Sequence, residues 1–257
     1  MSKILKKVKA GRLVFAVVYT PCSPGDSPKV RAEKRKASTA AREKLNAKTS
    51  FQKLERSLAA NFDTGDLFVT PTYDDKHLPD SRDKAMRKVR FFLSKLKKSR
   101  AARGEELHYI YVTEGAYPGG RLHHHLVINS TSTGNDLEEI CKCWIYGDNV
   151  EVRQLSFDKT HTYEDLASYL TKEPREWGHP KVGERTWTPS LGLLRPETET
   201  EAVPDCVTLT APPEAETLAR VGPVTNGYGE FTWIKYMMPK ADKKKRPKIR
   251  RRRQKKE

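Results

Sequence analysis

The chain has 257 residues, 36% of them hydrophobic and 32% charged, so it is long enough for one large domain but is polar for a chain that is folded throughout. It carries no run of 18 apolar residues, only four cysteines and no P-loop motif, which excludes a membrane-spanning protein, a disulfide scaffold and a P-loop motor. This cysteine usage favours a reducing cytoplasm, and the net charge of +16 indicates an anionic partner such as nucleic acid.

The positive charge is concentrated at the two ends of the chain. Residues 1–50 carry 13 Lys and Arg against 3 Asp and Glu, and residues 240–257 carry 12 against 2, which leaves residues 51–239 with a net charge of −4. This distribution predicts phosphate-binding ends on an ordinary domain. We expect a basic N-terminal arm over residues 1–60 and a basic tail over residues 240–257 that is disordered without nucleic acid. Solvated ends that only aid solubility are the alternative.

The first strong strand covers residues 67–73, and Pro71 interrupts it because proline cannot donate a ladder hydrogen bond. A basic helix follows over residues 81–100, with apolar residues at helical spacing on one side. Its many Lys and Arg side chains either contact a DNA backbone or form a solvated outer face.

A β-hairpin is predicted next, with residues 109–114 and 121–129 as its strands. Because side chains alternate along a strand, His123 and His125 point to the same face and can hold one divalent cation.

A symmetric hairpin loop places Glu114 opposite Arg121 and Val112 opposite His123. Since cross-strand partners point the same way, Glu114 is expected on the face of His123 and His125. A register slip of one residue would reverse this, and a simple ion pair of Glu114 with Arg121 is the alternative role.

Three further elements complete the expected domain. A helix over residues 135–146 and a strand over residues 149–155 precede a helix over residues 162–172. On this last helix Tyr169 and Lys172 are three residues apart and therefore neighbours.

The rest of the chain has weaker patterns. Residues 196–217 are acidic and Pro-containing and are expected as a mobile linker, with a late strand over residues 228–238. We therefore predict an α+β fold whose central antiparallel sheet has helices packed on it. The nuclease-like domain is expected over residues 61–195, and the linker with the late aromatic segment over residues 196–239.

Three motifs in this order resemble those of the HUH endonucleases, and most closely those of the rolling-circle replication initiators of small phages and plasmids. Residues 68–73, Phe-Val-Thr-Pro-Thr-Tyr, are similar to the first motif, although Pro71 departs from it. Residues 120–128 resemble the His-hydrophobe-His motif, with His124 in place of the aliphatic residue, and residues 166–172 resemble the Tyr-x-x-Lys motif. A register that uses His124 with another partner is the alternative. The resemblance implies an HUH domain related to RNA-recognition modules.

The resemblance also implies that Tyr169 attacks a scissile phosphate of single-stranded DNA and forms a 5′-phosphotyrosine, with Lys172 stabilising the developing charge. Tyr169 and Lys172 are thus the expected catalytic residues. Tyr163 is a possible second nucleophile, but six residues of helix turn it by roughly 120° from Tyr169, so one nucleophile and a buried Tyr163 are favoured.

His123 and His125 would hold Mg²⁺ or Mn²⁺, and Glu114 is the first choice for the oxygen ligand that these hard cations prefer. Asp74 and Asp75 are the reserve ligands.

The leading hypothesis is therefore a metal-dependent tyrosine endonuclease and strand transferase that initiates rolling-circle replication. Its expected partners are single-stranded DNA at a replication origin and a host helicase and polymerase, in the cytoplasm of a bacterial host, with no membrane. A transposase with the same chemistry is one alternative. The other is a non-catalytic RNA-recognition-like binding protein that exposes Tyr109 and Tyr111 on its sheet.

Overall fold

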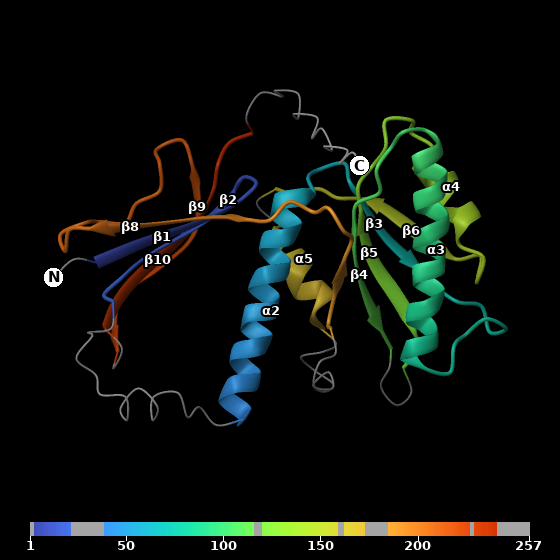
Figure 1. Cartoon of the computed structure of the whole chain (residues 1–257), viewed down its shortest axis with the longest axis horizontal. Helices are drawn as coiled ribbons and strands as arrows, with labels where there is room; N and C mark the ends of the chain where they lie inside the picture. The colour runs from blue at the N-terminus through green and yellow to red at the C-terminus, as the bar shows by residue number, and fades with distance from the viewer. Residues whose placement is uncertain are drawn as a thin grey trace, which may run out of the picture.

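The computed structural model describes residues 3–21, 39–115, 120–158, 162–172, 185–226 and 229–240. Within these ranges the fold is α+β, with two antiparallel five-stranded sheets and four helices, as the sequence predicts for the class. Figure 1 shows a layered arrangement in which one sheet, a pair of helices, the other sheet and a second pair of helices follow one another. No helix in the described part of the chain has the length and apolar character needed to cross a membrane.

The first sheet has the strand order β8-β1-β2-β10-β9. Its strands are β1 (Lys3–Ala10), β2 (Leu13–Tyr19), β8 (Glu197–Val203), β9 (Glu216–Asn226) and β10 (Gly229–Met237). The late strand expected from the sequence is therefore confirmed as β10, and it pairs with β2 in the middle of the sheet.

The structure differs from the expectation for two segments, the N-terminal arm over residues 1–60 and the linker over residues 196–217. Strands β1 and β2 lie inside the first sheet, and β8 and the start of β9 belong to the same sheet. The lysines of β1 face the glutamates of β8, as in the 2.6 Å ion pair of Lys9 with Glu199. Opposite charges across two strands stabilise this pairing, and their separation along the chain hides it from a local reading of the sequence.

The second sheet has the strand order β6-β3-β5-β4-β7. Its strands are β3 (Leu67–Pro71), β4 (Tyr109–Glu114), β5 (His123–Ile128), β6 (Val150–Gln154) and β7 (Thr188–Pro189). All five lie inside the range 61–195 that the sequence assigns to a nuclease-like domain, although the boundaries themselves stay a prediction. The basic tail lies outside the described residues.

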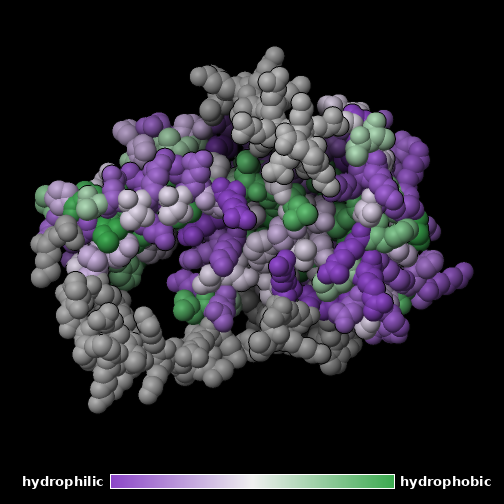
Figure 2. Space-filling view, in the orientation of Figure 1, coloured by the Kyte–Doolittle hydropathy of each residue, from purple (hydrophilic) through white to green (hydrophobic). Residues whose placement is uncertain are grey.

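The helices are α2 (Thr39–Asn61), α3 (Arg82–Ala102), α4 (Asp136–Cys143) and α5 (Tyr163–Leu170). Helices α3 and α4 bury their apolar side chains against one face of the second sheet, with Phe92 and Leu126 in that core. Helices α2 and α5 cover the other face, where Leu58 and Ala167 pack with Val127. Hydrophilic side chains gather over α3, the basic helix, on its outer side (Figure 2).

A buried ion cluster joins the first sheet to the helices α2 and α5. The ammonium group of Lys235 on β10 lies 3.0 Å from a carboxylate oxygen of Glu55 on α2, and it also pairs with Glu164 at the start of α5. Lys235 and Glu55 are only 5% and 2% exposed. Burial raises the pKa of the Glu55 carboxyl, although the charge of Lys235 opposes this. The cluster therefore fixes α5 between the two sheets.

The strand register decides which side chains meet around β5. Glu114 pairs with His123, and Val112 pairs with His125. The sequence-based register, in which Val112 pairs with His123, is therefore wrong by two residues. Because side chains alternate with a period of two, Glu114 nevertheless lies on the expected face. The pairing of β3 with β5 is interrupted at Pro71, as its missing N–H predicts.

Candidate metal centre and tyrosine

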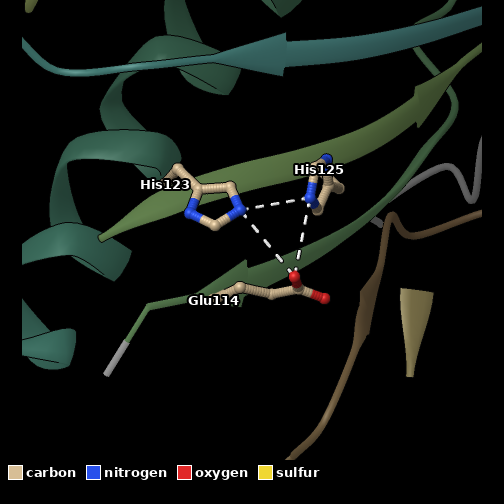
Figure 3. Close-up of side chains that lie close together, drawn as sticks. All are labelled: Glu114, His123 and His125. Atoms are coloured by element: carbon tan, nitrogen blue, oxygen red, sulfur yellow. Dashed lines mark hydrogen bonds and ion pairs between the residues drawn. The ribbon is translucent and has the colours of Figure 1, made fainter. Parts of the chain in front are cut away.

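Glu114, His123 and His125 converge on one face of the second sheet (Figure 3). The Nε2 atoms of the two imidazoles are 3.2 Å apart. One oxygen of Glu114, Oε2, lies 3.8 Å from Nε2 of His123 and 3.5 Å from Nε2 of His125. Since the three side chains come from paired residues of β4 and β5, the sheet itself fixes their positions.

The other ring nitrogens of the two histidines have partners that orient the rings. Nδ1 of His123 lies 2.9 Å from the backbone carbonyl oxygen of Arg121, which can only accept a hydrogen bond. Nδ1 of His125 lies 3.2 Å from the hydroxyl of Thr70 on β3. When Nδ1 carries the proton, Nε2 keeps a lone pair for a cation, and such second hydrogen bonds are typical of metal-binding histidines.

These donor atoms fit a divalent cation. The second carboxylate oxygen of Glu114, Oε1, is buried and has no hydrogen-bond partner among the described residues, which is unfavourable unless a cation or another donor reaches it. Ligands at right angles around an ion with bonds of about 2.1 Å lie roughly 3 Å apart, close to the spacing of the two imidazoles. The cluster is therefore a possible metal-binding site, and the geometry leaves the identity of the ion open.

Tyr169 lies against this cluster. Its ring meets the ring of His125 edge-on with 5.1 Å between centroids, and the ring of Phe68 with 5.8 Å between centroids. Helix α5 turns its buried side chains into the core and leaves Tyr169, which is 48% exposed, at the edge of that stripe. Burial and the negative charge of Glu114 raise the pKa of the phenol, so it is protonated at neutral pH unless positive charge is added.

The remaining expected site residues lie apart from the cluster. Lys172 is exposed just after α5, and it has no ion pair among the described residues. The reserve ligands are paired elsewhere, because Asp74 contacts His77 at 2.8 Å and Asp75 contacts Arg121 at 2.9 Å. Arg121 is thus the partner of Asp75 and not of Glu114.

Tyr163 is buried on α5, as the helical angle predicts. It is 3% exposed, its hydroxyl donates a 2.8 Å hydrogen bond to the carbonyl of Phe62, and its ring stacks on Phe157. Burial raises the pKa of this phenol strongly. Tyr163 is therefore a structural residue in this conformation.

The alternative readings of the sequence find no support in the structure. His124 points to the opposite face, where its ring nitrogens contact the hydroxyls of Tyr73 and Thr113 at 2.6 and 3.0 Å, and burial lowers its pKa to about 3. The exposed aromatic pair expected of an RNA-recognition-like protein is not formed, because Tyr111 is 2% exposed and Tyr109 packs on the core under α3.

Three residues beside the cluster are absent from the expectation. Thr70 orients His125, Phe68 stacks on the same imidazole at 5.5 Å, and Arg153 lies over the ring of Phe68 at 5.6 Å. The alternation of β6 indicates that Arg153 faces away from Val152, but only the pairing of β6 with β3 brings it to the site. Nothing local in the sequence predicts that pairing.

The comparisons with known proteins agree with the motifs. Residues 66–174 match the family model of the replication-associated proteins of the ORF2 type, and the cluster and Tyr169 both lie inside this segment. The match confirms the resemblance to the rolling-circle replication initiators of the HUH type and supports a role in replication initiation. No curated protein matches the chain. A solved structure, the hypothetical protein ORF119 from Sulfolobus islandicus rod-shaped virus 1, is similar with 13% identity and a TM-score of 0.34 over 50% of this chain and 97% of that one.

Proposed function

We propose that this protein nicks single-stranded DNA at a replication origin and holds the cleaved strand as a 5′-phosphotyrosine on Tyr169. The observation that carries the proposal is the contact of the Tyr169 ring with His125 of the Glu114–His123–His125 cluster. A nucleophile and a cluster of metal-ligating side chains on one face of a sheet can act on the same phosphate. The match to a replication-associated family supports DNA as the substrate.

In the proposed reaction the phenol oxygen of Tyr169 forms a bond to phosphorus, and the bond from phosphorus to the 3′ oxygen of the preceding nucleotide breaks. The phenol proton passes to solvent, which the half-exposed side chain reaches, and the departing 3′ oxygen takes up a proton. One phosphodiester replaces another, so no nucleotide hydrolysis is needed, and the free 3′-hydroxyl can prime DNA synthesis. Attack by a 3′-hydroxyl on the phosphotyrosine reverses these steps and rejoins the strand.

Glu114, His123 and His125 would hold the divalent cation, with Mg²⁺ or Mn²⁺ as the proposed ions. When bound, such an ion supplies positive charge that polarises the non-bridging phosphate oxygens and stabilises charge in the transition state. We propose Lys172 as a further cation that approaches the phosphate when DNA binds. A helicase and a polymerase of the host would complete replication.

Labelled single-stranded oligonucleotides that tile the origin, incubated with Mn²⁺ and analysed on denaturing gels, test this proposal. The wild-type protein is expected to form a covalent adduct that EDTA prevents. Tyr169→Phe should form no adduct yet bind the same strand, whereas the matched variant Tyr163→Phe should retain the adduct. A wild-type protein that forms no adduct with any strand would refute the proposed nuclease.

A further inference from the structure

The strand β6 brings an arginine to the edge of the candidate site. Arg153 pairs with Phe68 across β6 and β3, so both side chains lie on the face that carries the cluster. The guanidinium carbon lies 5.6 Å from the centroid of the Phe68 ring. The same ring stacks on His125 and meets the ring of Tyr169 edge-on. Phe68 is therefore the common neighbour of the arginine, the metal-ligating imidazole and the tyrosine.

The guanidinium group keeps donors for an anion. Its Nε lies 3.0 Å from Glu151, its ion-pair partner among the described residues, and the side chain is 60% exposed. An ion pair so exposed contributes little to stability. Because the pair is made through Nε, the two terminal nitrogens can donate to a further acceptor. Contact with an aromatic face restricts an arginine and favours one position of the fork.

Arginine also suits phosphate better than the exposed Lys172 does. The planar guanidinium offers parallel N–H donors that match two phosphate oxygens, whereas an ammonium group acts as a point charge. Lys172 follows the end of α5 and has no ion pair among the described residues, while Arg153 is held against the site by the ring of Phe68.

We propose that Arg153 binds the scissile phosphate beside Tyr169 and stabilises the charge that develops on it during strand transfer. This inference rests on the proposed function, because it assigns a role within the same site. No bond to Arg153 forms or breaks in the reaction. Arg153 places the phosphate between the cluster and the phenol oxygen.

The test compares Arg153→Gln and Arg153→Lys with Arg220→Gln, a matched control on β9 in the first sheet, where the arginine is exposed. The first measurement is binding of a fluorescent dT20 oligonucleotide in EDTA at several salt concentrations. Loss of one phosphate contact on a single strand lowers the slope of log affinity against log salt by about 0.7. We expect this decrease for Arg153→Gln and not for Arg153→Lys or Arg220→Gln.

The second measurement is the single-turnover rate of adduct formation on the strand that the wild-type protein cleaves. Arg153→Gln should be slower by about 100-fold, as for the loss of one donor to a developing charge, and Arg153→Lys should recover part of the rate. A neutral methylphosphonate at the scissile linkage should slow the wild-type protein more than it slows Arg153→Gln.

The outcomes separate the two proposals. If wild type forms the adduct and Arg153→Gln equals Arg220→Gln in rate and in salt slope, the role of Arg153 is refuted and the nuclease stands. If wild type forms no adduct, the proposed nuclease fails, and the salt slope still decides whether Arg153 contacts phosphate. An equal methylphosphonate penalty in wild type and Arg153→Gln would show that the arginine acts only on the structure.

Discussion

The ring of Tyr169 on helix α5 contacts the ring of His125 on strand β5, with 5.1 Å between their centroids. The two residues are brought together because α5 packs on the sheet face from which His125 projects, and the apolar residues of α2 and α5 form the core beneath. This contact joins the tyrosine motif to the histidine motif. It is the arrangement that a phosphotyrosine mechanism requires.

Loss of one ligand should remove the metal site. We expect His125→Ala to weaken Mn²⁺ binding by at least about 100-fold, because even changes in the groups behind a ligand cost about 10- to 100-fold. Isothermal titration with Mn²⁺ measures this directly. His77→Ala is the control, since His77 is exposed and pairs with Asp74 outside the cluster. Unchanged affinity in His125→Ala would remove the metal assignment.

Thr70 should influence the same site through His125. In Thr70→Val the hydroxyl that contacts Nδ1 at 3.2 Å is lost while the shape is kept. We expect Mn²⁺ affinity to fall by about 10-fold or more, with near wild-type affinity in Thr70→Ser. Equal affinity in all three proteins would mean that the backbone alone orients this imidazole.

The buried cluster around Lys235 should make a large contribution to stability. Lys235→Met leaves the carboxylate of Glu55 buried without its partner, and such a loss costs about 3–5 kcal/mol. Urea unfolding measures the change in the free energy of unfolding. The control is Lys9→Met, which removes an exposed pair with Glu199 and should change stability by less than about 1 kcal/mol. Similar values for both variants would contradict the assignment.

The basic tail should bind DNA through its charge. Residues 240–257 carry 12 Lys and Arg, and each phosphate contact on a single strand contributes about 0.7 to the salt slope. Deletion of residues 241–257 should therefore weaken binding of dT20 and flatten its dependence on salt. Fluorescence anisotropy between low and moderate salt measures both effects. An unchanged slope would show that the tail does not contact DNA.

The sequence predicts the site better than it predicts the fold around it. Alternation along a strand is enough to place His123, His125 and Glu114 on one face, and it survives a register error of two residues. The helical angle likewise separates Tyr169 from Tyr163. These inferences depend on local geometry, which a short segment determines.

Contacts between distant segments are beyond such inference. The lysines of β1 suggest a free basic arm because the glutamates of β8 that face them lie about 190 residues away. Thr70 and Arg153 reach the site only through the pairing of β3 with β5 and β6. Strand order arises from packing of the whole domain, so no local pattern specifies it.

The most direct measurement is the identity of the amino acid that becomes linked to DNA. The wild-type protein would be incubated with its cleavable strand and Mn²⁺, digested with trypsin and nuclease, and analysed by mass spectrometry. The account predicts that the nucleotide-linked peptide carries the modification on Tyr169. A modification on Tyr163 or on any other residue, or cleavage without a linked peptide, would contradict it.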